Sequence, residues 1–209
     1  YDRRRQRQMC IRDRNNIFIF NFYNSQYCKV FRKKIWISNM KVACIQLSSG
    51  ENYNRNFKDI IKYINQAIKN KADLIITPET SSLMSADKNN LFKYSYEMKN
   101  DPIIKKVKLI AKSKKKWILL GSMCIKEKSK LRNRSILIGP NGEIKTYYDK
   151  INMFDVKVSK KEQHKESKVF KAGKKLVSAT LPWGKIGLSI CYDLRFPELY
   201  RNLSKRNLS

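Results

Sequence analysis

Histidine is almost missing from this 209-residue chain, in which His164 is the single example. A serine or cysteine nucleophile that used histidine as its base would have to recruit that one side chain. The residue lies in the polar run 159–166, which we expect to be a solvated loop with no apolar strand to hold the ring in place. We therefore favour a proton acceptor other than histidine for any nucleophile in this chain.

Paired cysteines and long apolar runs are absent too. The five cysteines are an odd number and none stand in a C-x-x-C spacing, which excludes a disulfide scaffold and a zinc ribbon. We expect no metal, no other cofactor and a reducing, cytoplasmic location. No apolar run approaches the roughly 20 residues of a membrane span, so we expect no membrane partner.

Acidic residues are scarce, since 17 Asp and Glu stand against 46 Lys and Arg, and the net charge is +29. Such a charge is typical of nucleic-acid-binding proteins, which we keep as an alternative function. The lysines are spread over the whole chain, however, and no arginine-rich or aromatic-lined segment is patterned to read or stack bases. We attribute the excess to a compositional bias toward Lys, Asn and Ile, and expect no specific nucleic-acid partner.

What the chain does contain is one cysteine where an apolar strand breaks into a polar turn. Residues 186–190 indicate a buried strand, and Pro197 followed by 199–203 indicates the start of a helix. Cys191 would then face backbone N–H groups and the positive end of a helix dipole, which favour the reactive thiolate. The alternative is a small core residue, the usual state of a free cysteine.

Two other predicted strands are followed by charged residues. A short apolar strand closes at Pro78 with Glu79 directly after it, and Lys150 ends a second strand over residues 146–150. A carboxylate beside a thiol acts as general base and then as general acid, and a lysine ammonium stabilises the oxyanion of a tetrahedral intermediate. Both residues are equally consistent with ordinary polar residues at strand ends.

The order Glu79, Lys150, Cys191 resembles the nitrilase superfamily of carbon–nitrogen hydrolases. The motifs that carry the resemblance are Thr-Pro-Glu at 77–79, Tyr-Asp-Lys-Ile-Asn at 148–152 and Cys-Tyr-Asp-Leu-Arg-Phe-Pro-Glu at 191–198. The resemblance covers residues 40 to about 201 and is strongest to the branch that acts on deaminated glutathione and related ω-amides. It implies an α/β fold of the nitrilase-like, four-layer αββα type, which the spacing of the elements alone would not distinguish from other α/β folds.

The resemblance also implies roles for the residues. Glu79 would take the proton of Cys191, and Lys150 with the backbone N–H of Tyr192 would hold the oxyanion. Ammonia would leave and a thioester would remain on the cysteine. A further family carboxylate corresponds to Glu166. We expect the substrate to be a small carboxylated amide; a non-catalytic relative of the family is the alternative.

Arg195 and Asn152 need separate interpretations. Arg195 would either bind a carboxylate of the substrate or form an ion pair with Glu198 that pins the turn behind Cys191, and the i,i+3 spacing favours the ion pair. Asn152 stands where many family members have histidine, which argues against a proton relay at that position.

Periodicity in the rest of the chain agrees with an α/β chain. Helix 54–69 is predicted to have an apolar face, and Asp101-Pro102 is a good N-cap and first-turn pair for a helix to about residue 114. The predicted strands are 41–47, 73–77, 117–125, 132–138, 143–148, 176–181 and 185–190.

The two ends of the chain carry further expectations. Residues 1–39 are rich in Arg where the remainder is rich in Lys, so we expect a non-native or artefactual extension with Met40 as the true start. We expect residues 40–209 to be a partial carbon–nitrogen hydrolase domain, incomplete at the C-terminus and poorly active, because family members continue through strands that complete the second sheet. For the full-length protein we expect a homo-oligomer.

Overall fold

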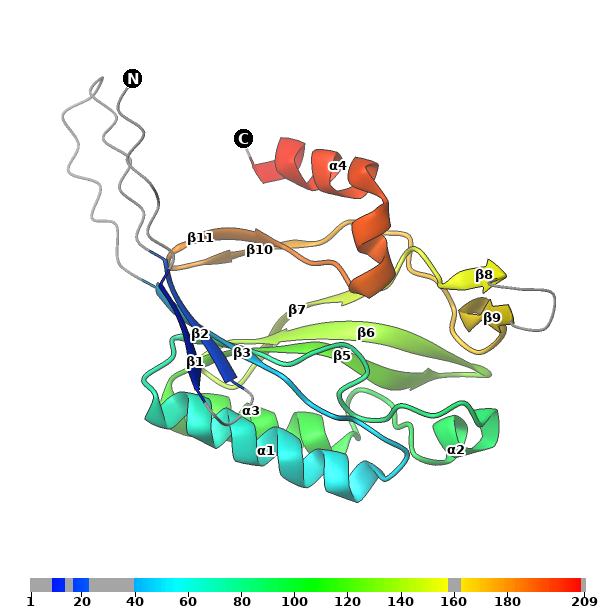
Figure 1. Ribbon diagram of the computed structural model, residues 1–209, viewed down its shortest axis with the longest axis horizontal. Coiled ribbons are helices and arrows are strands. Elements are labelled where there is room, and N and C mark those ends of the chain that lie inside the picture. The colour runs from blue at the N-terminus through cyan, green and yellow to red at the C-terminus, as the bar shows by residue number, and fades with distance from the viewer. Residues whose placement is uncertain (1–8, 14–16, 23–39, 158–162, 208–209) are drawn as a thin grey trace.

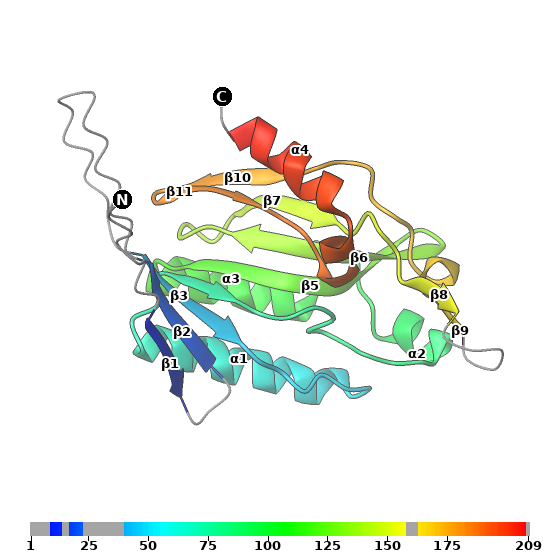
Figure 2. The ribbon, with the colours of Figure 1, turned by 45° about the horizontal axis from the view of Figure 1, so that its top comes forward.

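The fold has four layers, seen in a computed structural model that describes residues 9–13, 17–22, 40–157 and 163–207. Helices α1 (Tyr53–Lys69) and α3 (Pro102–Lys114) form the first layer, below a seven-stranded sheet. A two-stranded hairpin forms the third layer and helix α4 (Pro197–Asn207) the fourth (Figures 1 and 2). The predicted αββα arrangement is confirmed.

The large sheet has the strand order β1-β2-β3-β4-β5-β6-β7. Its strands are β1 (Met9–Asp13), β2 (Ile17–Phe22), β3 (Met40–Ile45), β4 (Leu74–Ile76), β5 (Trp117–Glu127), β6 (Lys130–Ile138) and β7 (Ile144–Asp149). The pairs β3–β4 and β4–β5 are parallel, whereas β5–β6 and β6–β7 are antiparallel. Strands β4, β5 and β7 therefore run in one direction, and the loops that follow β4 and β7 leave the same edge of the sheet.

Strands β1 and β2 fall within residues 1–39. They continue the sheet beyond β3, with β2 antiparallel to β3 from Ile17 opposite Ile45 to Phe22 opposite Met40. The other residues of this segment lie outside the described ranges. The non-native origin of residues 1–39 stays a prediction.

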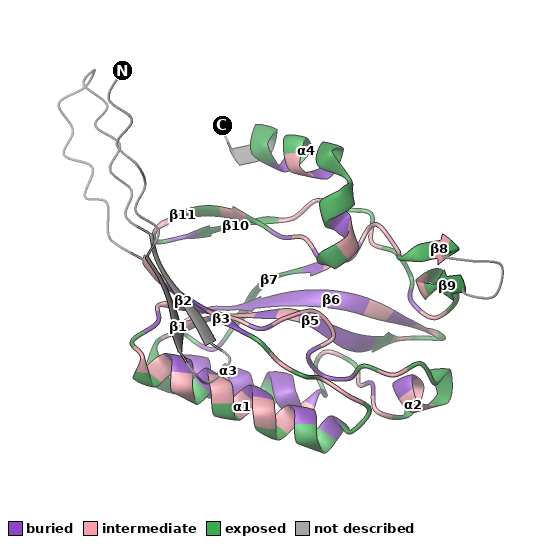
Figure 3. Ribbon diagram, viewed as in Figure 1, coloured by how far each residue is buried: buried purple, intermediate pink, exposed green. Residues whose placement is uncertain are grey.

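The helical layer packs an apolar face onto the sheet, as the periodicity predicts. Asn52 caps α1 by accepting a hydrogen bond from the backbone N–H of Arg55, and Asp101 caps α3. Ile60 and Ile64 of α1 are fully buried in the core beneath the sheet. Figure 3 shows the buried residues concentrated on β5, β6 and the inner sides of these helices. Within the described ranges, no helix combines the length and apolar character needed to cross a membrane.

A second core lies between the sheet and the hairpin. The hairpin pairs β10 (Ser178–Leu181) with β11 (Gly184–Gly187), and Leu181 packs there against Val42, Leu74 and Leu137. Both strands are shorter than predicted. Leu188 and Ile190 leave the hairpin because they pack instead against Tyr148 of β7. The chain thus turns away from the hairpin just before Cys191.

The elements that were not predicted include, besides β1 and β2, three short ones: α2 (Lys88–Lys93), β8 (Asp155–Lys157) and β9 (Gln163–Lys165). The prediction of a solvated loop over 159–166 was wrong for β9, which pairs with β8, although its side chains are exposed. Residues 158–162 lie outside the described ranges. Strands of three residues are too short for alternation to reveal them.

A bulge in β5 contacts the loop that follows β4 and holds it in place. The register of β5 against β6 shifts between Leu120 and Met123, and Gly121 lies at this irregularity. The N–H of Gly121 donates to Thr77 Oγ1 at 3.0 Å. A Cβ on Gly121 would lie 1.9 Å from the carbonyl oxygen of Thr77, so only glycine allows this close approach.

We predict that Gly121→Ala lowers the free energy of unfolding by about 2 kcal/mol, because backbone atoms must move to admit the methyl group. Gly50→Ala is the matched control, since a Cβ at Gly50 meets nothing within 4 Å, and should change stability by less than about 0.5 kcal/mol. Urea unfolding of both variants measures the difference. Equal losses for the two variants would contradict the role of the bulge.

Candidate active site

The loop after β4 presents Glu79 at the edge of the sheet. Its neighbour Thr80 adopts a left-handed conformation with φ of 49° and donates its N–H to Ser122 Oγ at 2.7 Å. Ser122 also donates its backbone N–H to the Pro78 carbonyl and accepts from the N–H of Ser81. The bulge of β5 therefore holds the backbone on both sides of Glu79.

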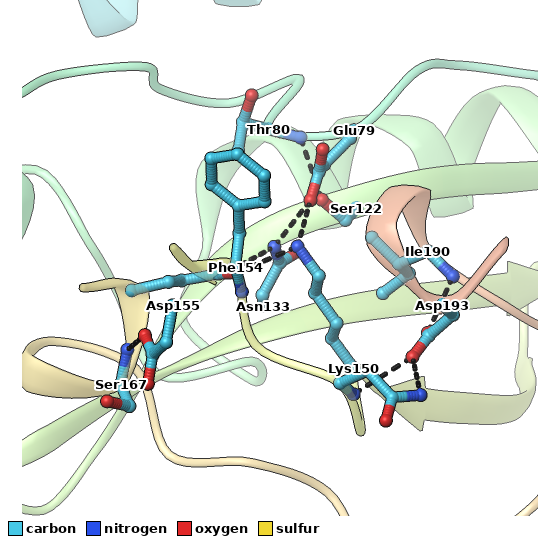
Figure 4. Close-up of polar contacts among 12 residues, drawn as sticks. Glu79, Thr80, Ser122, Asn133, Lys150, Phe154, Asp155, Ser167, Ile190 and Asp193 are labelled. Atoms are coloured by element: carbon cyan, nitrogen blue, oxygen red, sulfur yellow. Dashed lines mark hydrogen bonds and ion pairs between the residues drawn. The ribbon is translucent and has the colours of Figure 1, made fainter. Parts of the chain in front are cut away.

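Lys150 follows β7 and is withdrawn from solvent, with 2% of its side chain exposed. Its Nζ lies 2.9 Å from Glu79 Oε1 and 2.9 Å from Glu166 Oε2. Figure 4 shows the lysine side chain extending to the Glu79 carboxylate. Burial alone would lower the pKa of Lys150, but the hydrogen bonds and charges of Glu166 and Glu79 outweigh it and raise the pKa. Lys150 therefore remains an ammonium.

Glu166 reaches the same point from a different segment, the 3-10 helix η1 (Glu166–Lys168). Its Oε2 accepts from Lys150 and from the backbone N–H of Phe154 at 2.7 Å. Its backbone carbonyl accepts from the N–H of Phe170. The structure brings Glu79, Lys150 and Glu166 together.

Cys191 opens the 3-10 helix η2 (Cys191–Arg195) in a left-handed conformation, with φ of 46°. This conformation is uncommon for a residue with a side chain and is found at functional sites. The residue is exposed. The alternative prediction of a core cysteine is therefore wrong.

The prediction that the surroundings of Cys191 favour a thiolate is also wrong. The pKa of the Cys191 thiol is raised to about 11, first by desolvation and then by the hydrogen bond and negative charge of Glu79. The positive charge of Lys150 opposes this shift without cancelling it. Desolvation and the neighbouring carboxylate together raise the thiol pKa, so the sulfur stays protonated and needs a base.

Asp193 ties the Cys191 turn to the loop after β7. Its carboxylate is fully buried and accepts from four donors. These are Tyr148 OH at 2.7 Å, Asn152 N at 2.9 Å, Asn152 Nδ2 at 2.8 Å and Ile190 N at 3.0 Å. Figure 4 shows Asp193 between Ile190 and the loop of Lys150. Asn152 is thus a structural donor rather than a relay, and the nucleophile's turn is fixed relative to Lys150.

Asn133 of β6 also belongs to the site, and the sequence did not reveal it. Its Nδ2 donates to Glu79 Oε1 at 2.9 Å and to Glu166 Oε1 at 3.0 Å. In the sequence, this residue is only an amide within a predicted strand, flanked by Arg132 and Arg134. The side chains of these two arginines point to other partners, Glu127 and Asp149. Nothing in the sequence alone says that this amide meets the two carboxylates.

Comparison with known proteins identifies the family. Residues 41–208 match the carbon-nitrogen hydrolase family. The chain belongs to that family. It is 34% identical over 172 residues to the deaminated glutathione amidase of Yersinia enterocolitica, a match that covers 80% of this chain and 59% of that protein. The enzyme of the same name from Dictyostelium discoideum is 35% identical over 181 residues, covering 82% of this chain and 62% of its own length.

The fold is shared with solved carbon-nitrogen hydrolase relatives. The crystal structure of the Caenorhabditis elegans NitFhit protein superimposes with a TM-score of 0.69 at 29% identity, covering 76% of this chain and 39% of that one. The nitrilase fold is therefore confirmed. The chain spans about 60% of the length of the two amidases.

The predicted ion pair between Arg195 and Glu198 is wrong for this carbon-nitrogen hydrolase. Glu198 binds Arg201 instead, at 2.6 Å, because both lie on α4 while Arg195 precedes that helix in η2. Arg195 is exposed.

Tyr192 packs edge-on against Phe154 and Phe196, with ring centroids 5.1 and 5.5 Å apart. Among the described residues, no group of three or more His, Cys, Asp and Glu is arranged to hold a metal ion.

We predict that Glu79→Gln lowers the pKa of the Cys191 thiol from about 11 by about one unit or more, because the neutral amide removes a negative charge that favours the thiol. The pH dependence of alkylation by iodoacetamide, followed at the Cys191 peptide by mass spectrometry, measures this pKa. Lys150→Met should act in the opposite sense, since it removes the opposing positive charge. An unchanged or higher pKa in Glu79→Gln would show that Glu79 does not act on the sulfur.

Proposed function

We propose that this protein hydrolyses a non-peptide C–N bond of a small carboxylated amide through a thioester on Cys191, with release of ammonia. One observation carries the proposal: the Lys150 ammonium lies 2.9 Å from the carboxylates of both Glu79 and Glu166, and the nearby Glu79 raises the pKa of the Cys191 thiol. The group combines a nucleophile, a base for it and a fixed positive charge for a developing oxyanion.

In the first half-reaction, Glu79 takes the thiol proton while the sulfur of Cys191 bonds to the amide carbonyl carbon. The carbonyl π electrons move to oxygen, where Lys150 and the backbone N–H of Tyr192 stabilise the negative charge. The intermediate then collapses and the C–N bond breaks. Glu79 gives its proton to the nitrogen, ammonia leaves, and a thioester remains.

In the second half-reaction, Glu79 takes a proton from water, whose oxygen attacks the thioester carbon. The C–S bond breaks, the proton returns to the sulfur of Cys191, and a carboxylic acid departs. The raised thiol pKa fits this cycle, because a sulfur that holds its proton in the resting site accepts it back readily. Glu166 acts with Glu79 on Lys150 and so orients the ammonium toward the oxyanion.

Several features of the chain and its relatives indicate the substrate class. Two relatives are named deaminated glutathione amidases, which supports an amide as the substrate. Arg195 has no ion pair among the described residues and lies in the same five-residue turn as Cys191, so it is available to a substrate carboxylate. The net charge of +29 also attracts anionic substrates. Tyr192 offers an aromatic wall beside the nucleophile.

Three further proposals concern the compartment, the oligomeric state and residues 1–39. A nucleophilic thiol must remain reduced, so we infer a reducing compartment such as the cytoplasm. The alternatives of a nucleic-acid-binding protein and of a non-catalytic relative do not require Glu79, Lys150, Glu166 and Cys191 to meet. We infer a homo-oligomer for the full-length protein and retain residues 1–39 as a non-native extension.

We predict that the purified protein releases ammonia slowly, in line with the poor activity expected of the partial domain, and faster from glutaramate than from butyramide, which is the same amide without the carboxylate. Cys191→Ala should abolish the release, because no thioester can form. Intact-protein mass spectrometry during turnover should detect the acyl adduct on the wild type and none on Cys191→Ala.

Cys44→Ala is the matched control, since Cys44 is a second cysteine, in strand β3, that takes no part in the proposed reaction, and it should retain activity. Ammonia release by Cys191→Ala at the wild-type rate, or no release by the wild type, would overturn the proposed function. Equal rates for the two substrates would overturn only the carboxylated substrate class.

A further inference from the structure

Asn133 links the two carboxylates of the site through a single side chain. It is 2% exposed, and its Nδ2 donates to Glu79 Oε1 and to Glu166 Oε1. A side-chain amide has two N–H donors, so both are used on the carboxylates. Its Oδ1 is buried with no hydrogen-bond partner among the described residues. The hydrogen bonds to the Glu79 and Glu166 carboxylates therefore fix the orientation of the amide.

The unpaired oxygen indicates more than a role in packing. Buried polar atoms in proteins are nearly always hydrogen-bonded, and an unsatisfied one is destabilising. Asn133 tolerates an unsatisfied acceptor while both of its donors meet charged groups, which form the stronger class of hydrogen bond. Asn133 thus directs both of its N–H donors at Glu79 and Glu166, although this orientation leaves its own carbonyl oxygen without a hydrogen bond.

The donors fall unevenly on the two oxygens of Glu79. The ammonium of Lys150 and the amide of Asn133 both bind Oε1, at 2.9 Å each. An oxygen that already accepts two hydrogen bonds, one of them from a cation, is a poor proton acceptor. The proton that moves between sulfur, the departing nitrogen and water must then be carried by Oε2.

We propose that Asn133 is a positioning residue that, together with Lys150, occupies Oε1 of Glu79 and reserves Oε2 for proton transfer with Cys191. This inference rests on the proposed function, since it assigns a role within that reaction. Asn133 acts through Glu79 and touches no reacting atom. Its neutral amide orients two negative groups without changing the charge of the site.

Asn133→Asp tests the proposal, because it replaces the amide with a carboxylate of the same shape that cannot donate. We expect kcat for glutaramate to fall by about 100-fold or more with KM within about threefold, as for loss of a general base. The low-pH limb of kcat should also move to higher pH, because a third carboxylate favours protonated Glu79. The other charged or titratable groups that face Glu79 are Lys150, Glu166 and Cys191.

Ser135→Ala is the matched control. Ser135 lies two residues along β6, on the same face as Asn133, is also buried, and its hydroxyl donates to the Leu120 carbonyl at 3.3 Å. Its loss should lower the urea midpoint but leave kcat and the pH limb unchanged. Should Asn133→Asp fail to fold, Asn133→Ser keeps an uncharged side chain at this position. This variant should also lose kcat, with a smaller shift of the low-pH limb in the same direction.

The outcomes separate the two proposals. A wild type and a Ser135→Ala variant that both release no ammonia would overturn the proposed function and this inference with it. An active wild type with an Asn133 variant that folds and keeps both its kcat and its pH limb would overturn this inference alone. A loss of kcat with the displaced limb, absent from Ser135→Ala, would support it.

Discussion

A lysine ammonium that is shut away from water between two carboxylates is the interaction on which the rest of the site depends. Lys150 has 2% of its side chain exposed, and a charge so buried is strongly destabilising unless it is paired and hydrogen-bonded. Glu79 and Glu166 supply that pairing, each at 2.9 Å from the ammonium nitrogen. Any segment that carries one of these three residues is therefore held in place relative to the other two.

The fold meets this requirement through strand direction and local backbone features. Because β4 and β7 run the same way, the residues that follow them leave one edge of the sheet. The bulge at Gly121 receives the Glu79 loop, and Asp193 joins the Cys191 turn to the loop of Lys150. The position of the nucleophile is thus fixed by the buried hydrogen bonds of Asp193 and not by direct continuation of a strand.

Residues at strand ends were the part of the site that the sequence could predict. Glu79 and Lys150 follow apolar strands and carry charges typical of catalysis, and Glu166 came from the family resemblance. Asn133 could not be found, because its role depends on the register of β6 and on the direction in which one amide points. The acidity of Cys191 was predicted with the wrong sign, since the prediction counted a helix dipole and omitted desolvation and the nearby charge of Glu79. Among the elements, the long amphipathic α1 was predictable, whereas the three-residue strands β8 and β9 were not.

The charge state of Lys150 is the most direct test of this account. Lysine labelled with ¹³C at Cε gives an NMR signal that reports protonation, and comparison with Lys150→Met assigns the signal of this residue. We predict that Lys150 keeps its proton above the ordinary lysine pKa of about 10.4, because the hydrogen bonds to Glu166 and Glu79 outweigh burial and raise its pKa. Loss of the proton below that value would contradict the account, because the lysine would then not be paired with both carboxylates.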